Sequence, residues 1–263
     1  MPTSISFDLS SCMLESDANK RVIKPDKDGV YHGLCMMVLG NQPSQNGKIY
    51  DPETMADCLT NPESAFYKRL KAGGLRGEYG HPDIQSEADL PRIPKIDMKC
   101  VSHLIVRAYT GEKTEKGNIP VYADIKPCGP YGQYLAESLE SPVINTAFSL
   151  RSLVEQIGTT PEGYIRQRVL AMITWDAVDV GGYRCAAKVA PANSVESLSI
   201  PIKKENSRFL QNLVSMEVID DDQLRDILKS DTIRVVNTTI VPGETITTSS
   251  GHPVSAFHMC FRH

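Results

Sequence analysis

The chain of 263 residues is 41% hydrophobic and 23% charged, so it can bury one good core and is neither disordered nor fibrous. Its net charge of -4 argues against a protein that covers nucleic acid, since such domains concentrate positive charge. The 7 scattered cysteines include no CxxC pair, and no apolar run approaches the ~18 residues of a membrane helix. We therefore expect a cytosolic chain with free thiols and with no metal, cofactor, nucleic-acid or membrane partner.

The apolar pattern predicts a mainly β core with helices at its periphery. Strands are expected over residues 30–39, 101–109, 119–125, 143–154 and 165–180. Helices are expected after the capping residues Asp51 and Asn61, each followed by Pro and Glu, and over residues 129–140, 206–216 and 221–229. The predicted division is a lead-in of residues 1–20, a core domain of residues 21–190 and a C-terminal tail of residues 191–263.

The segment of residues 74–83 places a histidine and a proline just after three glycines. Glycine lets the backbone bend sharply, and Pro82 restricts His81 toward an extended backbone, so we expect an irregular loop that brings the imidazole close to another segment. Of the six histidines, three lie in the tail, and His32 and His103 lie in strand-like runs. His81 is therefore the candidate general base, because functional groups are over-represented in loops.

A serine and an aspartate in the two long apolar segments are the other candidates. In the strand over residues 143–154, Ser149 and Arg151 fall on the face opposite the apolar one, where the cation lies near a developing oxyanion. Asp176 lies deeper in its apolar run than Asp179, which is near Gly181. Each residue also has an ordinary structural explanation, as a strand serine, a turn histidine or a strand-end acid.

Four motifs in this chain order resemble those of the prohead core (capsid maturation) proteases of tailed bacteriophages. They are NGKIY at 46–50, GEYGHP at 77–82, AFSLRS at 147–152 and WDAV at 175–178. The family patterns are approximately NGRxY, GELxHP, GVSSRG and FDxV. The first two matches are specific and the other two are looser, because the paired serines are here Ser149-Leu150 and the acid motif lacks its following proline.

The resemblance implies a serine endopeptidase with an assemblin-like fold, an α+β protein with a mainly antiparallel β-barrel core surrounded by helices. It makes His81 the base, Ser149 the nucleophile and Asp176 the third member, with Asp179 as the alternative acid and Arg151 in an oxyanion or supporting role. The implied substrates are the scaffold (core) and major capsid proteins of the phage, processed inside the prohead in the host cytoplasm. A homo-oligomer is compatible with the sequence.

Proteases that resemble this chain cleave after a glutamate preceded by a small or apolar residue. Glu196 at the junction with the tail and Glu217 within the tail are therefore candidate self-cleavage sites, and Arg76 and Lys48 are guesses for the cation that reads the substrate glutamate. The alternative function is an inactive, scaffold-like capsid assembly protein with the protease fold. A metal site formed by the three histidines and Cys260 of the tail is disfavoured, because zinc ligands must be held rigidly.

Overall fold

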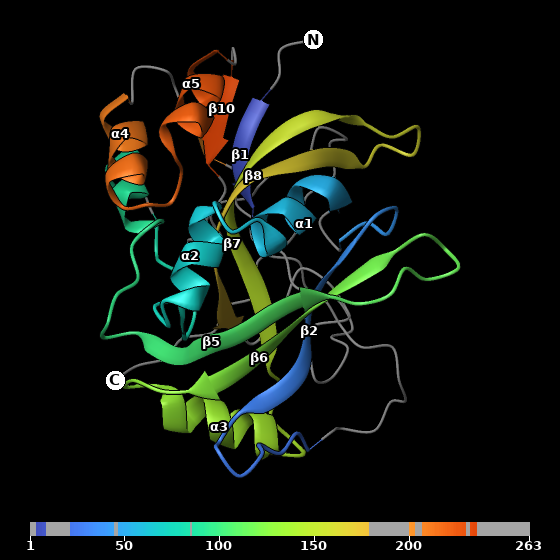
Figure 1. Cartoon of the computed structure of the whole chain (residues 1–263), viewed down its shortest axis with the longest axis vertical. Helices are drawn as coiled ribbons and strands as arrows, with labels where there is room; N and C mark the ends of the chain where they lie inside the picture. The colour runs from blue at the N-terminus through green and yellow to red at the C-terminus, as the bar shows by residue number, and fades with distance from the viewer. Residues whose placement is uncertain are drawn as a thin grey trace, which may run out of the picture.

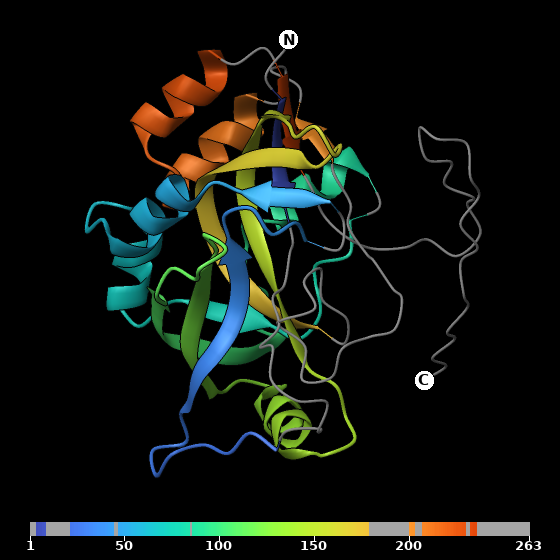
Figure 2. The same cartoon turned by 90° about the vertical axis from the view of Figure 1, so that its right-hand side faces the viewer.

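The computed structural model describes residues 4–8, 22–44, 47–84, 86–178, 200–202, 207–229 and 232–235. Their strands form one six-stranded and one four-stranded sheet, which Figures 1 and 2 show from two sides. The larger sheet has the order β3-β8-β7-β1-β10-β9 and the smaller one the order β2-β6-β5-β4. Most neighbouring strands are antiparallel, and the pairs β1–β10 and β3–β8 are parallel.

Strands β2, β5, β6 and β8 lie close to the predicted ranges, whereas β1, β3, β4, β9, β10 and η1 were not predicted. The strands are β1 (Ser4–Asp8), β2 (Tyr31–Leu39), β3 (Lys48–Tyr50), β4 (Arg76–Glu78), β5 (Val101–Thr110), β6 (Ile119–Pro127), β7 (Ala147–Thr159), β8 (Ile165–Val178), β9 (Ile200–Ile202) and β10 (Thr232–Val235). The helices are α1 (Pro52–Thr60), α2 (Ala65–Lys71), the 3-10 helix η1 (Glu87–Arg92), α3 (Gly132–Glu140), α4 (Ser207–Ser215) and α5 (Asp221–Lys229).

The predicted α+β class with antiparallel sheets is confirmed, but the closed barrel is not. Within the described ranges the two sheets are open, and their outer strands β3, β9, β2 and β4 do not pair to close a ring. The pairing of β1 with both β7 and β10 brings residues 4–8 and residues 232–235 into one sheet. The predicted lead-in therefore contributes a strand to the larger sheet.

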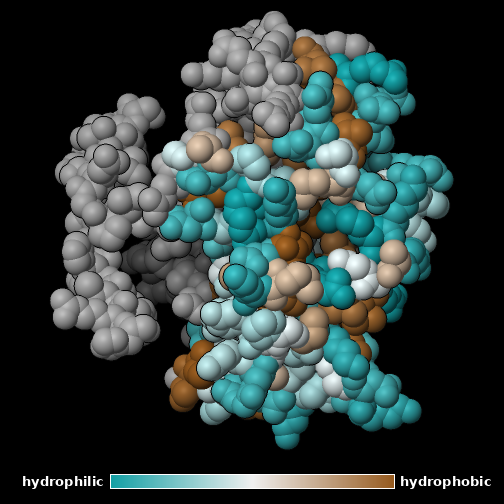
Figure 3. Space-filling view, turned by 90° about the vertical axis from the view of Figure 1, so that its left-hand side faces the viewer, coloured by the Kyte–Doolittle hydropathy of each residue, from teal (hydrophilic) through white to brown (hydrophobic). Residues whose placement is uncertain are grey.

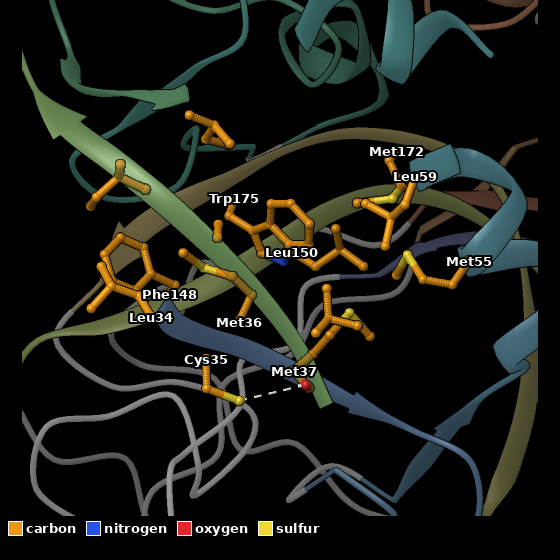
Figure 4. Packing of buried hydrophobic residues seen from close by; sticks show 14 of the residues in the cluster. Leu34, Cys35, Met36, Met37, Met55, Leu59, Phe148, Leu150, Met172 and Trp175 are labelled. Carbon is orange, nitrogen blue, oxygen red and sulfur yellow. Dashed lines mark hydrogen bonds between the residues drawn. The ribbon is translucent and has the colours of Figure 1, made fainter. Parts of the chain in front are cut away.

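The main hydrophobic cluster lies against the face of β7 and β8 that carries Leu150 and Trp175. Figure 4 shows these side chains packed with Met36 and Met37 of β2 and with the helix residue Met55. The rings of Phe66 in α2 and Trp175 meet edge to face, with centroids 5.7 Å apart. Burial of these apolar side chains attaches the first two helices and the smaller sheet to β7 and β8.

A second hydrophobic cluster covers the other face of the larger sheet. Leu153 of β7 and Ile173 of β8 pack there with residues of α4 and α5 and with Ile84, Leu90 and Ile93 of the segment after His81. Both faces of the β7–β8 pair are thus buried. The face of the molecule shown in Figure 3 is mostly hydrophilic, with hydrophobic side chains in small groups.

The predicted N-cap of α1 is confirmed, whereas α2 begins later than the sequence predicted. Asp51 caps α1, since its carboxylate accepts from the Thr54 N–H at 3.2 Å. The cap of α2 is Ser64, which accepts from the Tyr67 N–H at 3.1 Å, and not the expected Asn61. The Asn61 side chain instead accepts from the Glu63 N–H within the preceding turn, because a short polar side chain stabilises turns and caps equally well.

Three further expectations are adjusted by the structure. The segment of residues 74–83 is not wholly irregular, because it contains β4. The strand expected from residue 143 begins only at Ala147, and Val143 and Ile144 are exposed in the loop before it. Helices α4 and α5, in the predicted tail, pack on the core through the second cluster; the boundary near residue 190 stays a prediction. Of the described helices, none is long and apolar enough to cross a membrane.

Candidate active site

Ser149 and Asp176 lie directly opposite each other on the antiparallel strands β7 and β8. Opposed residues of an antiparallel pair project from the same face of the sheet with Cβ atoms about 5 Å apart. Both side chains therefore lie on the face opposite Leu150 and Trp175, as the alternation in the sequence predicted. The face is covered: Ser149 is 3% exposed and Asp176 is 0% exposed.

The backbone after β4 carries His81 to Asp176. Tyr79 forms a bridge with Ala177 of β8, and the Gly80 N–H donates to the Ala177 carbonyl oxygen at 2.7 Å. Gly80 has a φ of +82°, a conformation that side-chain-bearing residues rarely adopt. The chain then turns so that His81 Nδ1 lies 2.9 Å from Asp176 Oδ2. The expected approach of the imidazole to a distant segment is thus explained by the loop that follows β4.

The structure joins His81 to Asp176 by a hydrogen bond and places Ser149 opposite Asp176 in the β7–β8 register. The Ser149 hydroxyl and the His81 imidazole, both described, form none with each other, whereas His81 and Asp176 are bonded. Catalytic hydrogen bonds in structures without substrate are often long and tighten only when substrate binds. The arrangement can pass a proton from a serine to an imidazole oriented by a carboxylate.

Arg151 holds both oxygens of the Asp176 carboxylate and shares Oδ2 with His81. Its Nε lies 2.9 Å from Oδ2, and its Nη2 lies 2.8 Å from Oδ1 and 2.7 Å from Oδ2. Its Nη1 donates to the carbonyl oxygens of Ile93 at 2.9 Å and Lys95 at 3.1 Å. Because all three guanidinium nitrogens are engaged within the protein, this geometry favours the supporting role over the oxyanion role.

Asp176 is held as a carboxylate. Burial by itself raises the pKa of Asp176, but the Arg151 guanidinium and the hydrogen bonds from His81 and from the Glu78 N–H outweigh it and lower the pKa to about 2. A carboxylate without a proton must accept at this contact, so the His81 Nδ1 carries the hydrogen. The Nε2 atom is then the basic nitrogen of the ring.

His103 is the histidine that the sequence interpretation assigned to structure, and its surroundings agree. It is fully buried, its Nδ1 lies 2.9 Å from Ser102 Oγ, and burial lowers its pKa to about 4. Its ring meets Phe148 edge to face.

Glycine at position 77 allows β4 to lie close to β8. A Cβ atom on Gly77 would lie 2.2 Å from the Trp175 carbonyl oxygen and 2.4 Å from His103 Nε2, so only glycine fits there.

Two charged residues outside the predicted triad, Glu78 and Arg92, also belong to this site. Glu78 is buried and accepts from Arg92 Nη2 at 2.6 Å and from the Asp97 N–H at 2.7 Å. Glu78 stands within the GEYGHP motif, which was the available signal, but motif position alone does not tell a buried acid from a solvated one.

The remaining candidates lie elsewhere. The structure does not describe Asp179, Glu196, the tail histidines or Cys260. The surroundings of Asp176 and Asp179 therefore cannot be compared, and the choice between them stays a prediction. Glu217 lies in an exposed turn just after α4. Lys48 pairs with Ile165 at the far end of β8, which removes it from the surroundings of Asp176. In the described part of the chain, His, Cys, Asp and Glu form no group of three suited to a metal ion.

A family model and a curated relative agree with the motif resemblance. A family model described as the Peptidase S80 family matches residues 9–235. The capsid maturation protease of Pseudomonas phage phiKZ is 31% identical over 193 residues, which are 68% of each chain. The solved structure of the bacteriophage T4 capsid assembly protease, gp21, matches with a TM-score of 0.40 and 13% identity, covering 68% of this chain and 99% of its own. The family model spans most of the sequence and its four motifs, and the chain therefore belongs to the Peptidase S80 family.

Proposed function

We propose that this protein is a serine endopeptidase of capsid maturation, with Ser149 as nucleophile, His81 as base and Asp176 as the orienting acid. The observation that carries the proposal is the 2.9 Å contact of His81 Nδ1 with Asp176 Oδ2, directly opposite Ser149 in the β7–β8 register. Membership of a peptidase family and the identity with a phage capsid maturation protease support the reaction class. An inactive assembly protein has no need of this arrangement.

In the proposed reaction His81 Nε2 accepts the proton of Ser149 Oγ as the oxygen attacks the substrate carbonyl carbon. The same nitrogen then returns the proton to the leaving amine, and an acyl-enzyme remains on Ser149. A water molecule then attacks the acyl carbon as His81 takes its proton, and His81 returns that proton to Ser149 Oγ as the bond to the acid product breaks. Asp176, fixed by Arg151, stabilises the imidazolium that forms in both halves of the reaction.

The proposed substrates are the scaffold and major capsid proteins of the phage that encodes this chain, cleaved inside the prohead after glutamate. The substrate class follows the phiKZ relative, and the glutamate preference follows the motif resemblance. Self-cleavage is proposed as one route to activation, following the glutamate preference.

The test is cleavage of the phage's scaffold and capsid proteins, co-expressed with the protease. We expect His81→Ala and Ser149→Ala to abolish processing, and Ser152→Ala to retain it. Ser152 is a matched control, because it is a buried serine of the same strand. Processing that persists in both His81→Ala and Ser149→Ala refutes the catalytic assignment and favours the inactive assembly protein. Peptides with Glu or Gln before the scissile bond test the glutamate preference.

A further inference from the structure

Glu78 is a buried carboxylate for which the proposed reaction has no direct use. It ends β4 three residues before His81, and its side chain is 2% exposed. Oε2 lies 2.6 Å from Arg92 Nη2 and 3.5 Å from Arg151 Nη2, and Oε1 accepts from the Asp97 N–H at 2.7 Å. Its own N–H donates to Asp176 Oδ1 at 2.9 Å. A buried charge with this many partners is fixed in one position.

The contacts of Glu78 join two parts of the site. The segment of residues 92–97 returns over β7, where Arg151 Nη1 binds the Ile93 and Lys95 carbonyl oxygens. Glu78 binds the same segment at Asp97 and, through Arg92, near Lys95. Arg151 is therefore held between Asp176 and this segment, and Glu78 secures the segment from the β4 side.

Four charged groups at the centre of this cluster balance while the imidazole is neutral, and Asp97 adds a further acid beside Arg92. Two carboxylates, Glu78 and Asp176, face two guanidinium groups, Arg92 and Arg151. The other titratable groups facing the cluster are Asp97 and Cys100 beside Arg92, and His103 on β5. His103 is neutral at neutral pH because burial lowers its pKa to about 4, and burial raises the pKa of the Cys100 thiol. Without Glu78, Arg151 would keep Asp176 as its carboxylate partner and Arg92 would keep Asp97 beside it.

We propose that Glu78 is a positioning residue of the reaction, which holds Arg151 and the 92–97 segment and whose charge leaves Asp176 free to stabilise the imidazolium of His81. This inference rests on the proposed function. Glu78 touches neither the substrate nor the reacting atoms. Its effect passes through Arg151 and Asp176, so it should appear in kcat and in the pH profile more than in KM.

The experiment measures kcat, KM and the pH dependence of kcat/KM for Glu78→Gln and Arg92→Gln with a cleavable peptide. We expect Glu78→Gln to lower kcat about tenfold to a hundredfold with little change in KM, the loss typical of displaced catalytic geometry. Removing a negative charge disfavours the imidazolium, so the acid limb moves to lower pH in Glu78→Gln. Removing a positive charge favours it, so the acid limb moves to higher pH in Arg92→Gln.

The matched control is Glu155→Gln, which removes a different buried acid of β7, paired with Arg168 away from His81. We expect its pH profile to equal that of the wild type. If Glu78 has only a structural role, the acid limb of the kcat/KM profile should stay at its wild-type pH in both Glu78→Gln and Arg92→Gln. That result overturns the proposal. If Glu78→Gln does not fold, Arg92→Gln decides alone, because the Arg92 side chain is 28% exposed and lies at the rim of the cluster. If Ser149→Ala still cleaves, the proposed function fails; if only the pH shifts are absent, this inference alone fails.

Discussion

Arg151 and Asp176, on adjacent strands, form a fully buried pair in which two guanidinium nitrogens contact both carboxylate oxygens at 2.7 to 2.9 Å. The pair lies between the sheet and the segment whose carbonyl groups at Ile93 and Lys95 bind the remaining nitrogen of Arg151. It connects the orientation of His81 to the stability of the core, because the same carboxylate binds the imidazole.

We therefore predict that Arg151→Met destabilises the protein by about 3 to 5 kcal/mol, since it leaves Asp176 as an uncompensated buried charge. The double variant Arg151→Met with Asp176→Asn should be less destabilised than the sum of the single variants, because no lone charge remains. Urea unfolding of the four proteins measures this coupling. Strictly additive effects would show that the pair is energetically unimportant.

Stability should depend on pH through His103. Its pKa falls from the ordinary 6.5 to about 4 on burial, so the unfolded chain binds a proton more readily than the folded one. The free energy of unfolding is therefore expected to decrease as the pH falls from about 6.5 toward 4. His103→Asn should remove this part of the slope, measured by urea unfolding at several pH values. An identical slope in the variant would contradict the assignment.

Gly77 should be intolerant of even one added carbon. Gly77→Ala places a Cβ atom 2.2 Å from the Trp175 carbonyl oxygen, a backbone atom that cannot rotate away. We expect the free energy of unfolding to fall by about 1 to 3 kcal/mol. Activity should also fall, because β4 must move away from β8 and carry His81 with it. Gly74→Ala is the control, since its nearest neighbour, the Arg69 carbonyl oxygen, lies 3.7 Å from the new Cβ. Equal melting temperatures for the two variants would refute this reasoning.

Self-cleavage, if it follows the glutamate preference, should occur after Glu196 and not after Glu217 while α4 is folded. The Val218 N–H of the second bond donates to the Leu213 carbonyl oxygen at 2.9 Å, and the Val218 side chain is buried in the second cluster. A protease needs that bond extended and free. Intact-mass measurements should show a shortened chain in the wild type and Glu217→Gln, and a full-length chain in Glu196→Gln and Ser149→Ala. A product ending at Glu217 would contradict the prediction.

The sequence by itself determined the elements whose signals are local. The strands at Tyr31–Leu39 and Ile165–Val178 and the helices at Ser207–Ser215 and Asp221–Lys229 follow from apolar periodicity, which depends only on neighbouring residues. Alternation along β7 also placed Ser149 opposite the apolar face. The chemistry of single residues left the roles of His81, Ser149 and Asp176 open. The four motifs, in their order along the chain, assigned those roles through the resemblance to one protease family.

Only the tertiary structure decided what surrounds these residues. The contact of His81 with Asp176 needs Gly80 to bond to Ala177, almost a hundred residues away, and no local pattern encodes that pairing. The burial of Ser149, the engagement of all three Arg151 nitrogens and the partners of Glu78 likewise arise from segments that meet across the β7 and β8 strands. A sequence specifies which groups are present, whereas their distances, charges and accessibility depend on long-range packing.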